Sequence, residues 1–126
     1  MKRTTSLMLI AVVAMVSFSA YADTRTLQLW TCTVNEGKTP ADVQTANGKW
    51  VKFVNSKVKG GDVRSFVVSA VTGDLGQFMY MDSYPSFEAW ASQRAAMLTP
   101  EGIAVEADLD SVSTCTSSSL HTSTES

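Results

Sequence analysis

Hydrophobic and polar positions follow two periods along the chain, and the changes of period predict six elements. Residues 27–34 alternate in the manner of a β-strand. The next segment places apolar residues at the spacing of one helix face: Val43, Ala46, Trp50, Phe53 and Val54. Thr39-Pro40-Ala41-Asp42 predicts the start of this helix, because threonine caps, proline suits the first turn and an acid complements the helix dipole. Gly60-Gly61 ends it.

The second half of the chain begins with two β-branched runs, residues 62–71 and 75–81. The turn residues Thr72-Gly73-Asp74 lie between them, so we expect a hairpin. Ser83-Tyr84-Pro85 predicts the start of a second helix. Its expected apolar face consists of Phe87, Trp90, Ala91, Met97 and Leu98.

The last quarter of the chain is less regular. Thr99-Pro100-Glu101-Gly102 interrupts the second helix, and residues 103–107 fit either one more helical turn or an irregular connection. Residues 109–116 are the last predicted strand. Residues 117–126 form a polar tail rich in serine and threonine, which we expect to be loose at its end.

The order strand, helix, strand, strand, helix, strand is that of a ferredoxin-like α+β domain with a four-stranded antiparallel sheet. We expect one such domain over residues 23–116. In this topology the first strand is internal and the last strand runs beside it in the opposite direction. Cys32 then faces Cys115, Thr31 opposes Thr116 and Thr33 opposes Thr114.

Residues 1–22 have the pattern of a secretory signal peptide. Lys2 and Arg3 precede an uncharged apolar run, and Ala20-Tyr21-Ala22 places small residues where a signal peptidase reads. The run is shorter than the roughly 20 residues that cross a bilayer, so we favour cleavage between Ala22 and Asp23 over a membrane anchor. A bacterial protein of this kind is periplasmic or secreted, and no membrane attachment remains after cleavage.

Cleavage would leave 104 residues, with eight basic and twelve acidic side chains and a net charge of −4. Such a balance gives no reason to expect nucleic acid as a partner. Cys32 and Cys115 are the two cysteines of the chain, and in an oxidising compartment an even pair predicts a disulfide. A metal site is not expected, because His121 is the only histidine.

The predicted strands carry more apolar side chains than two helices can cover. Leu27 and Leu29 alternate with Trp30 and Val34 on the first strand, and similar side chains lie on both faces of the hairpin: Val63, Phe66, Val67, Val68, Ala70, Val71, Phe78, Met79, Tyr80 and Met81. A monomer would be expected to have a polar second face. We therefore expect a second copy of the chain to cover it, forming a homodimer through the sheet.

The chain resembles the dimeric α/β-barrel superfamily, in which two ferredoxin-like subunits pack sheet against sheet. It is also similar to small exported bacterial proteins of unassigned function, on the basis of Trp50 in the first helix and Asp82-Ser83-Tyr84-Pro85 before the second. The resemblance covers residues 27–116. The superfamily includes monooxygenases, haem-degrading enzymes, isomerases and binding modules, and the fold does not choose among them.

The resemblance also implies that a cofactor-free enzyme of this kind would need a polar pocket. Haem-degrading members use a histidine ligand, but His121 lies in the tail, so we expect no cofactor. The candidate pocket residues are Asn47, Tyr80 and Arg94. Arg94 falls within the predicted apolar stripe, which allows two interpretations. Its guanidinium binds a ligand carboxylate, or its side chain lies over the core with the charged end in water or near Asp82.

Two hypotheses follow. The first is an exported homodimeric binding or structural module that takes a small apolar or acidic molecule. The alternative is a cofactor-free enzyme of the monooxygenase or isomerase kind, with Asn47, Tyr80 and Arg94 lining its pocket. Trp50 and Trp90 are expected to anchor the core in either case.

Overall fold

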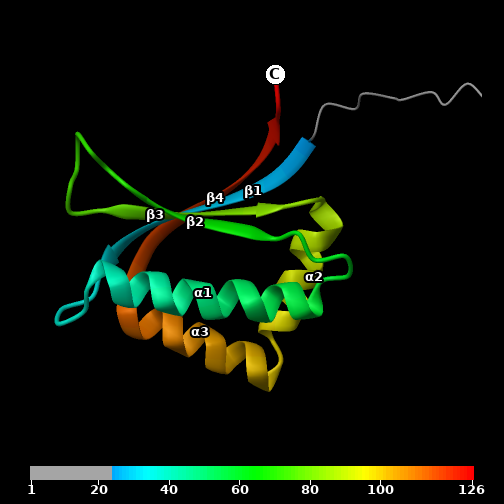
Figure 1. Cartoon of the computed structure of the whole chain (residues 1–126), viewed down its shortest axis with the longest axis horizontal. Coiled ribbons are helices and arrows are strands. Elements are labelled where there is room, and N and C mark those ends of the chain that lie inside the picture. Colours follow the sequence, from blue (N-terminus) through cyan, green and yellow to red (C-terminus); the bar gives the residue numbers. More distant parts are fainter. Residues whose placement is uncertain (1–23) are drawn as a thin grey trace, which may run out of the picture.

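The strands that the structure describes form one antiparallel sheet in the order β2-β3-β1-β4. This computed structural model describes residues 24–126, so the predicted signal peptide and its cleavage site lie outside the described residues. The strands are β1 (Thr24–Val34), β2 (Arg64–Ser69), β3 (Phe78–Tyr84) and β4 (Ser113–Thr124). Helices α1 (Pro40–Lys57), α2 (Phe87–Met97) and α3 (Pro100–Val112) lie on the same side of the sheet (Figure 1). The predicted ferredoxin-like fold is confirmed.

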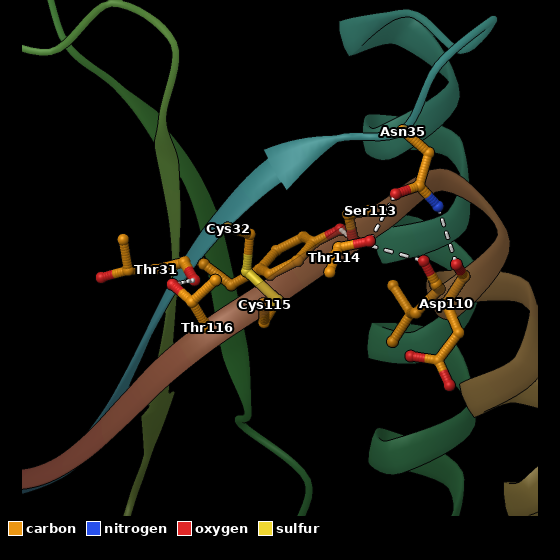
Figure 2. Close-up of a disulfide and its surroundings, with 10 residues drawn as sticks. Thr31, Cys32, Asn35, Asp110, Ser113, Thr114, Cys115 and Thr116 are labelled. Carbon is orange, nitrogen blue, oxygen red and sulfur yellow. Dashed lines mark hydrogen bonds between the residues drawn. A yellow bond between two sulfur atoms is a disulfide. The ribbon is translucent and has the colours of Figure 1, made fainter.

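Strand β1 lies inside the sheet, as predicted. It pairs with β3 from Thr26 to Cys32 and with β4 along its whole length. Cys32 lies opposite Cys115, and the predicted disulfide between them is present (Figure 2). Thr33 opposes Thr114, but a register shift after Thr31 gives that residue Ser117 in place of the predicted Thr116.

The end of the chain differs from the prediction. Residues 103–107 are helical, and α3 continues through residues 109–112, which we had assigned to the last strand. Strand β4 begins at Ser113 and continues to Thr124, so most of the predicted polar tail is a strand and only residues 125–126 lie beyond it. The reason is backbone pairing: β1 begins at Thr24, and its first residues supply hydrogen-bonding partners to the polar tail.

Asn35, in the turn after β1, holds the junction between α3 and β4 (Figure 2). Its Nδ2 donates to the Asp110 carbonyl at 2.9 Å, and its Oδ1 accepts from Thr114 Oγ1 at 2.6 Å. Its backbone N–H donates to the Val112 carbonyl at 2.9 Å. These bonds tie the end of β1 to the start of β4, where Ser113 turns into the interior.

The hairpin of β2 and β3 is confirmed, but its loop is longer than predicted. Pairing ends at Ser69 and Phe78, so residues 70–77 connect the strands in place of a tight turn at 72–74. Val71, which we had placed in the strand, is 92% exposed in this loop. The β-branched side chain of Val71 favours a strand, but in the loop of residues 70–77 it has no neighbouring layer to pack against.

Strand β3 continues further than predicted, through Asp82, Ser83 and Tyr84. Helix α2 begins at Phe87, and the Ser86 hydroxyl accepts from the Ala89 N–H at 3.1 Å as its N-cap. The predicted helix start at Ser83-Tyr84-Pro85 is therefore wrong. Extended pairing with β1 continues through Tyr84, and proline follows the strand without opening the helix.

The buried face of α2 also differs from the predicted stripe. The residues that face the interior are Ala89, Gln93, Ala96 and Met97. Phe87 is 57% exposed and stacks on the partly buried Trp90, with 5.1 Å between ring centroids. Leu98 is also exposed, so the two large apolar residues at the ends of the predicted stripe lie outside the core. Trp50, in contrast, is buried in the core as predicted.

The start of α3 crosses the end of α2 at Gly102. A Cβ atom at this position would collide with the carbonyl oxygen of Ala96 and would lie 2.6 Å from the Met97 Cα. Backbone atoms cannot move aside as a flexible side chain can. The close approach of the two helices therefore requires glycine.

We predict that Gly102→Ala lowers the free energy of unfolding by about 2 kcal/mol or more, since overpacking against backbone forces the helices apart. Gly48→Ala is the matched control: it lies mid-helix in α1 with open space around its Cβ position, and it should raise the value by about 1 kcal/mol. Urea denaturation followed by circular dichroism measures both. Equal stability of Gly102→Ala and the parent would contradict the close packing.

Candidate functional site

A cavity of about 130 Å³ lies between the inner face of the sheet and the helices. Aromatic residues of β1, α1 and β3 line it: Trp30, Trp50, Tyr80 and Tyr84. Its polar lining includes amides and charged groups from the sheet and from every helix: Gln28, Asn47, Asp82, Gln93, Arg94, Glu106 and Asp110. All three predicted pocket residues, Asn47, Tyr80 and Arg94, therefore line one cavity.

Asp82 is a buried carboxyl group in this cavity. Residues 78, 80, 82 and 84 of β3 alternate onto the inner face, so the strand register places Asp82 between Tyr80 and Tyr84. Its side chain lies opposite Gln28 on β1 and Ser65 on β2, and the residue is only 5% exposed. Burial raises its pKa to about 6, although hydrogen bonds from Ser65 and the Trp30 side chain favour the ionised form.

Asn47 supports Asp82 through Ser65. The Ser65 hydroxyl donates to Asp82 Oδ1 at 2.6 Å, and it accepts from Asn47 Nδ2 at 2.9 Å. Asn47 is 6% exposed, because α1 packs directly over β2 at this point. Three elements thus contribute to one hydrogen-bonded chain from Asn47 to Ser65 to Asp82, in which the Ser65 hydroxyl proton is directed to the carboxyl group.

Gln93 presents an unsatisfied acceptor. This residue of α2 lines the cavity and is 4% exposed, yet its Oε1 has no hydrogen-bonding partner among the described residues. Its neighbour on the sheet, Gln28, is satisfied, since Gln28 Oε1 accepts from Trp90 Nε1 at 2.8 Å. A buried carbonyl without a donor costs free energy, so Gln93 is a candidate contact for a ligand.

The two tyrosines stay protonated in this environment. Burial raises the pKa of both Tyr80 and Tyr84, and the Asp82 carboxyl raises them further. The Tyr80 hydroxyl is bonded to Ser113 Oγ at 3.0 Å, and Ser113 in turn donates to the Leu109 carbonyl at 3.2 Å. Tyr80 is therefore a donor tied to the α3–β4 junction, and it does not serve as a base.

Charged residues and the disulfide line the cavity at its exposed side. Arg94 of α2 is exposed, and so are Glu106 and Asp110 of α3. Cys115 lines the cavity too, so the disulfide forms part of its wall. Arg94 thus lines the same cavity as two acidic residues of α3.

His121 lies away from the cavity. It pairs with Leu27 across β1 and β4, and its ring is exposed and bonded to Ser119 Oγ at 2.8 Å. Within residues 24–126 there is no group of three or more His, Cys, Asp or Glu side chains that could hold a metal ion.

Comparisons with known proteins find likeness at the level of fold. No family model matches the chain, and neither does any curated protein. A solved structure of SnoaB, a cofactor-independent oxygenase from Streptomyces nogalater, is similar with a TM-score of 0.58 and 18% identity, over 83% of this chain and 97% of that one.

Two further solved structures belong to proteins without assigned function. A NIPSNAP family protein from Agrobacterium tumefaciens has a TM-score of 0.56 and 12% identity, over 83% of this chain and 91% of that one. A NIPSNAP domain protein from Burkholderia xenovorans has a TM-score of 0.54 and 13% identity, over 80% of this chain and 94% of that one. At these identities the comparison shows the fold alone: the chain has the same ferredoxin-like fold as these three proteins.

We predict that the free energy of unfolding falls by about 2 kcal/mol between about pH 4.5 and pH 7.5, because Asp82 binds its proton more tightly in the folded than in the unfolded chain. A raised acid pKa means that stability is lost as the pH rises through that window. Asp82→Asn should abolish the fall and be more stable than the parent at neutral pH.

Urea denaturation at both ends of the window measures this effect, with the exposed acid variant Glu36→Gln as control. Asp42 and Asp62 do not interfere, because hydrogen bonds from Thr39 and Arg25 respectively lower their pKa values and place their effect at lower pH. A pH dependence that Asp82→Asn leaves unchanged would show that this carboxyl is not buried.

Proposed function

We propose that the chain is an exported homodimeric module that binds a small molecule in the cavity between its sheet and helices. The observation that carries this proposal is the pairing of a buried carboxyl group, Asp82, with a buried unsatisfied carbonyl, Gln93, in the lining of one cavity. Each costs folding free energy while the cavity is empty. A ligand that supplies hydrogen-bond donors removes that cost, whereas a purely structural module gains nothing from it.

The size of the cavity limits the ligand. Its volume of about 130 Å³ is close to that of apolar cavities that hold a benzene ring. Aromatic walls and a few polar groups are the usual composition of a site for a small organic molecule. We therefore propose a ligand of about one ring.

Export is supported by two observations of different kinds. The sequence of residues 1–22 has the pattern of a signal peptide, and Cys32 and Cys115 form a disulfide. A search of the described residues finds no helix long and apolar enough to cross a membrane. We propose a periplasmic or secreted location on the first two grounds.

The homodimer is supported by the outer face of the sheet. The helices cover the other face (Figure 1), and the register sends apolar side chains from three neighbouring strands outward: Leu27, Leu29, Phe66, Val68, Met79 and Met81. We call these six the outer patch. Phe66 is 50% exposed. A contiguous apolar patch of this kind marks an interaction surface, and the resemblance to dimeric α/β-barrel proteins makes a second copy the proposed partner.

The alternative function is a cofactor-free enzyme of the monooxygenase or isomerase kind. One observation favours it: a carboxyl group with a pKa of about 6 beside aromatic rings is suited to take a proton from a weakly acidic substrate. Asn47, Tyr80 and Arg94 would then orient that substrate. Exchange of the acetophenone methyl protons for deuterium, fast with the parent and lost in Asp82→Asn, would favour this alternative over a binding module.

We predict that at least one member of a set of single-ring probes binds in the cavity: benzylamine, benzyl alcohol and benzoate. Amide chemical shifts should change at the residues of the lining. Leu109→Trp should weaken binding about tenfold or more by filling the cavity, and Ile103→Trp should not, because it lies exposed on the same helix. Failure of all three probes at millimolar concentration would contradict a binding site.

We predict that the parent chain sediments as a dimer at micromolar concentration and that Phe66→Asp converts it to a monomer, since a charge within the outer patch is costly to bury. Val71→Asp, in the exposed hairpin loop, should remain a dimer. Sedimentation velocity measures all three proteins. A monomeric parent, or a dimer that survives Phe66→Asp, would refute the proposed interface.

A further inference from the structure

The cavity lining carries an excess of acidic groups. Three carboxyl groups line it, those of Asp82, Glu106 and Asp110, against the single guanidinium of Arg94. The acids come from the sheet and from α3, on separate elements, so the cavity is acidic both at its buried carboxyl and at its exposed rim. This balance disfavours the acidic ligand that Arg94 alone suggested and favours a cation.

The hydrogen-bonding groups near Asp82 lead to the same conclusion. Ser65 already donates to Asp82, and Asn47 already donates to Ser65. Gln93 Oε1 has an open acceptor position. In the part of the chain that the structure describes, Gln93 Oε1 lacks a donor, and the buried Asp82 carboxylate lacks a cation within hydrogen-bonding distance, although it accepts from Ser65 and Trp30. An ammonium ion supplies both a positive charge and three N–H donors.

The walls of the cavity suit an organic cation. Trp30, Trp50, Tyr80 and Tyr84 come from three elements and line the same space as Asp82. The face of an aromatic ring carries partial negative charge and attracts a cation within about 6 Å, most strongly where water is excluded. Aromatic rings combined with a carboxyl group form the chemical environment that recognises alkylammonium ions.

We propose that this cavity binds a small organic ammonium ion of about the size of benzylammonium, with its N–H groups directed to the Asp82 carboxylate and Gln93 Oε1. This inference rests on the proposed binding function and names the ligand class of the same site. Arg94 is exposed, whereas the Asp82 carboxyl group is buried in the interior of the cavity.

Binding of a cation changes the protonation of Asp82. In the empty cavity its pKa is about 6, and a cation at contact distance lowers it because the ionised form is then paired. The other titratable groups that line the cavity are Tyr80 and Tyr84, whose raised pKa values keep them protonated, together with Arg94, Glu106 and Asp110. Binding at about pH 6 should therefore release about half a proton per ligand.

The test uses three probes of nearly equal size and different charge: benzylammonium, benzyl alcohol and benzoate. Isothermal titration calorimetry of the full exported chain at about pH 7.5 should show benzylammonium binding at least about tenfold more tightly than benzyl alcohol, and benzoate binding most weakly. Asp82→Asn should remove the preference for benzylammonium and leave benzyl alcohol unchanged. The exposed remote variant Glu36→Gln should keep the preference.

Proton release gives a readout that needs no variant. Titrations at about pH 6 in buffers of different ionisation enthalpy should show release with benzylammonium and none with benzyl alcohol. Equal affinities for all three probes, or proton uptake with benzylammonium, would overturn the ammonium inference while the binding function stands. Absence of binding by every probe would overturn the binding function and the inference together.

Discussion

The sheet is covered on one face only, and the register of β3 decides which side chains the covered face must accommodate. Phe78, Tyr80, Asp82 and Tyr84 alternate inward, while Met79 and Met81 alternate outward. A shift of one residue would bury the methionines and send Asp82 to the outer face. Pairing with β1 and β2 on both sides prevents that shift, so the acidic cavity and the outer patch are two consequences of one register.

The register of β3 and the disulfide together determine the arrangement of the strands. Strand β1 occupies the interior of the sheet, and the bond from Cys32 to Cys115 ties it to β4 beside the cavity (Figure 2). Asn35 adds hydrogen bonds to α3 and β4 at the same end. The wall formed by Tyr80, Ser113 and Cys115 is thereby held to the part of the sheet that carries Asp82.

Much of the fold was predictable because the signals for it are local. The structure confirms three predictions that rest on such signals: the start of α1 at its capping residues, the hairpin of β-branched strands, and the disulfide between the two cysteines. The ends of β3 and β4 were not predictable in the same way. Pro85 resembles a helix start, and the polar residues after Ser117 resemble a tail, but pairing with β1 makes both segments strands. Such pairing depends on residues far apart in the sequence.

The candidate site was predicted only in part, because strand ends and buried helix faces also depend on contacts between residues far apart in the sequence. Asn47, Tyr80 and Arg94 were identified, but Asp82 was missed because the predicted strand ended at Met81, three residues before its observed end at Tyr84. Continuing the alternation of Phe78 and Tyr80 by one step would have placed it inward. Gln93 was missed because large aromatic residues were assigned to the buried face of α2, whereas small residues let that helix approach the sheet and leave Phe87 exposed.

The Asp82 carboxyl group lies buried between the sheet and the helices, and the proposed ligand would bind there. A ¹³C NMR titration of the Asp82 carboxyl carbon measures its pKa directly. We expect a value of about 6 in the free protein, which decreases when benzylammonium is added. A value near 4 that the ligand leaves unchanged would contradict this expectation, since that is the ordinary pKa of a solvated aspartate.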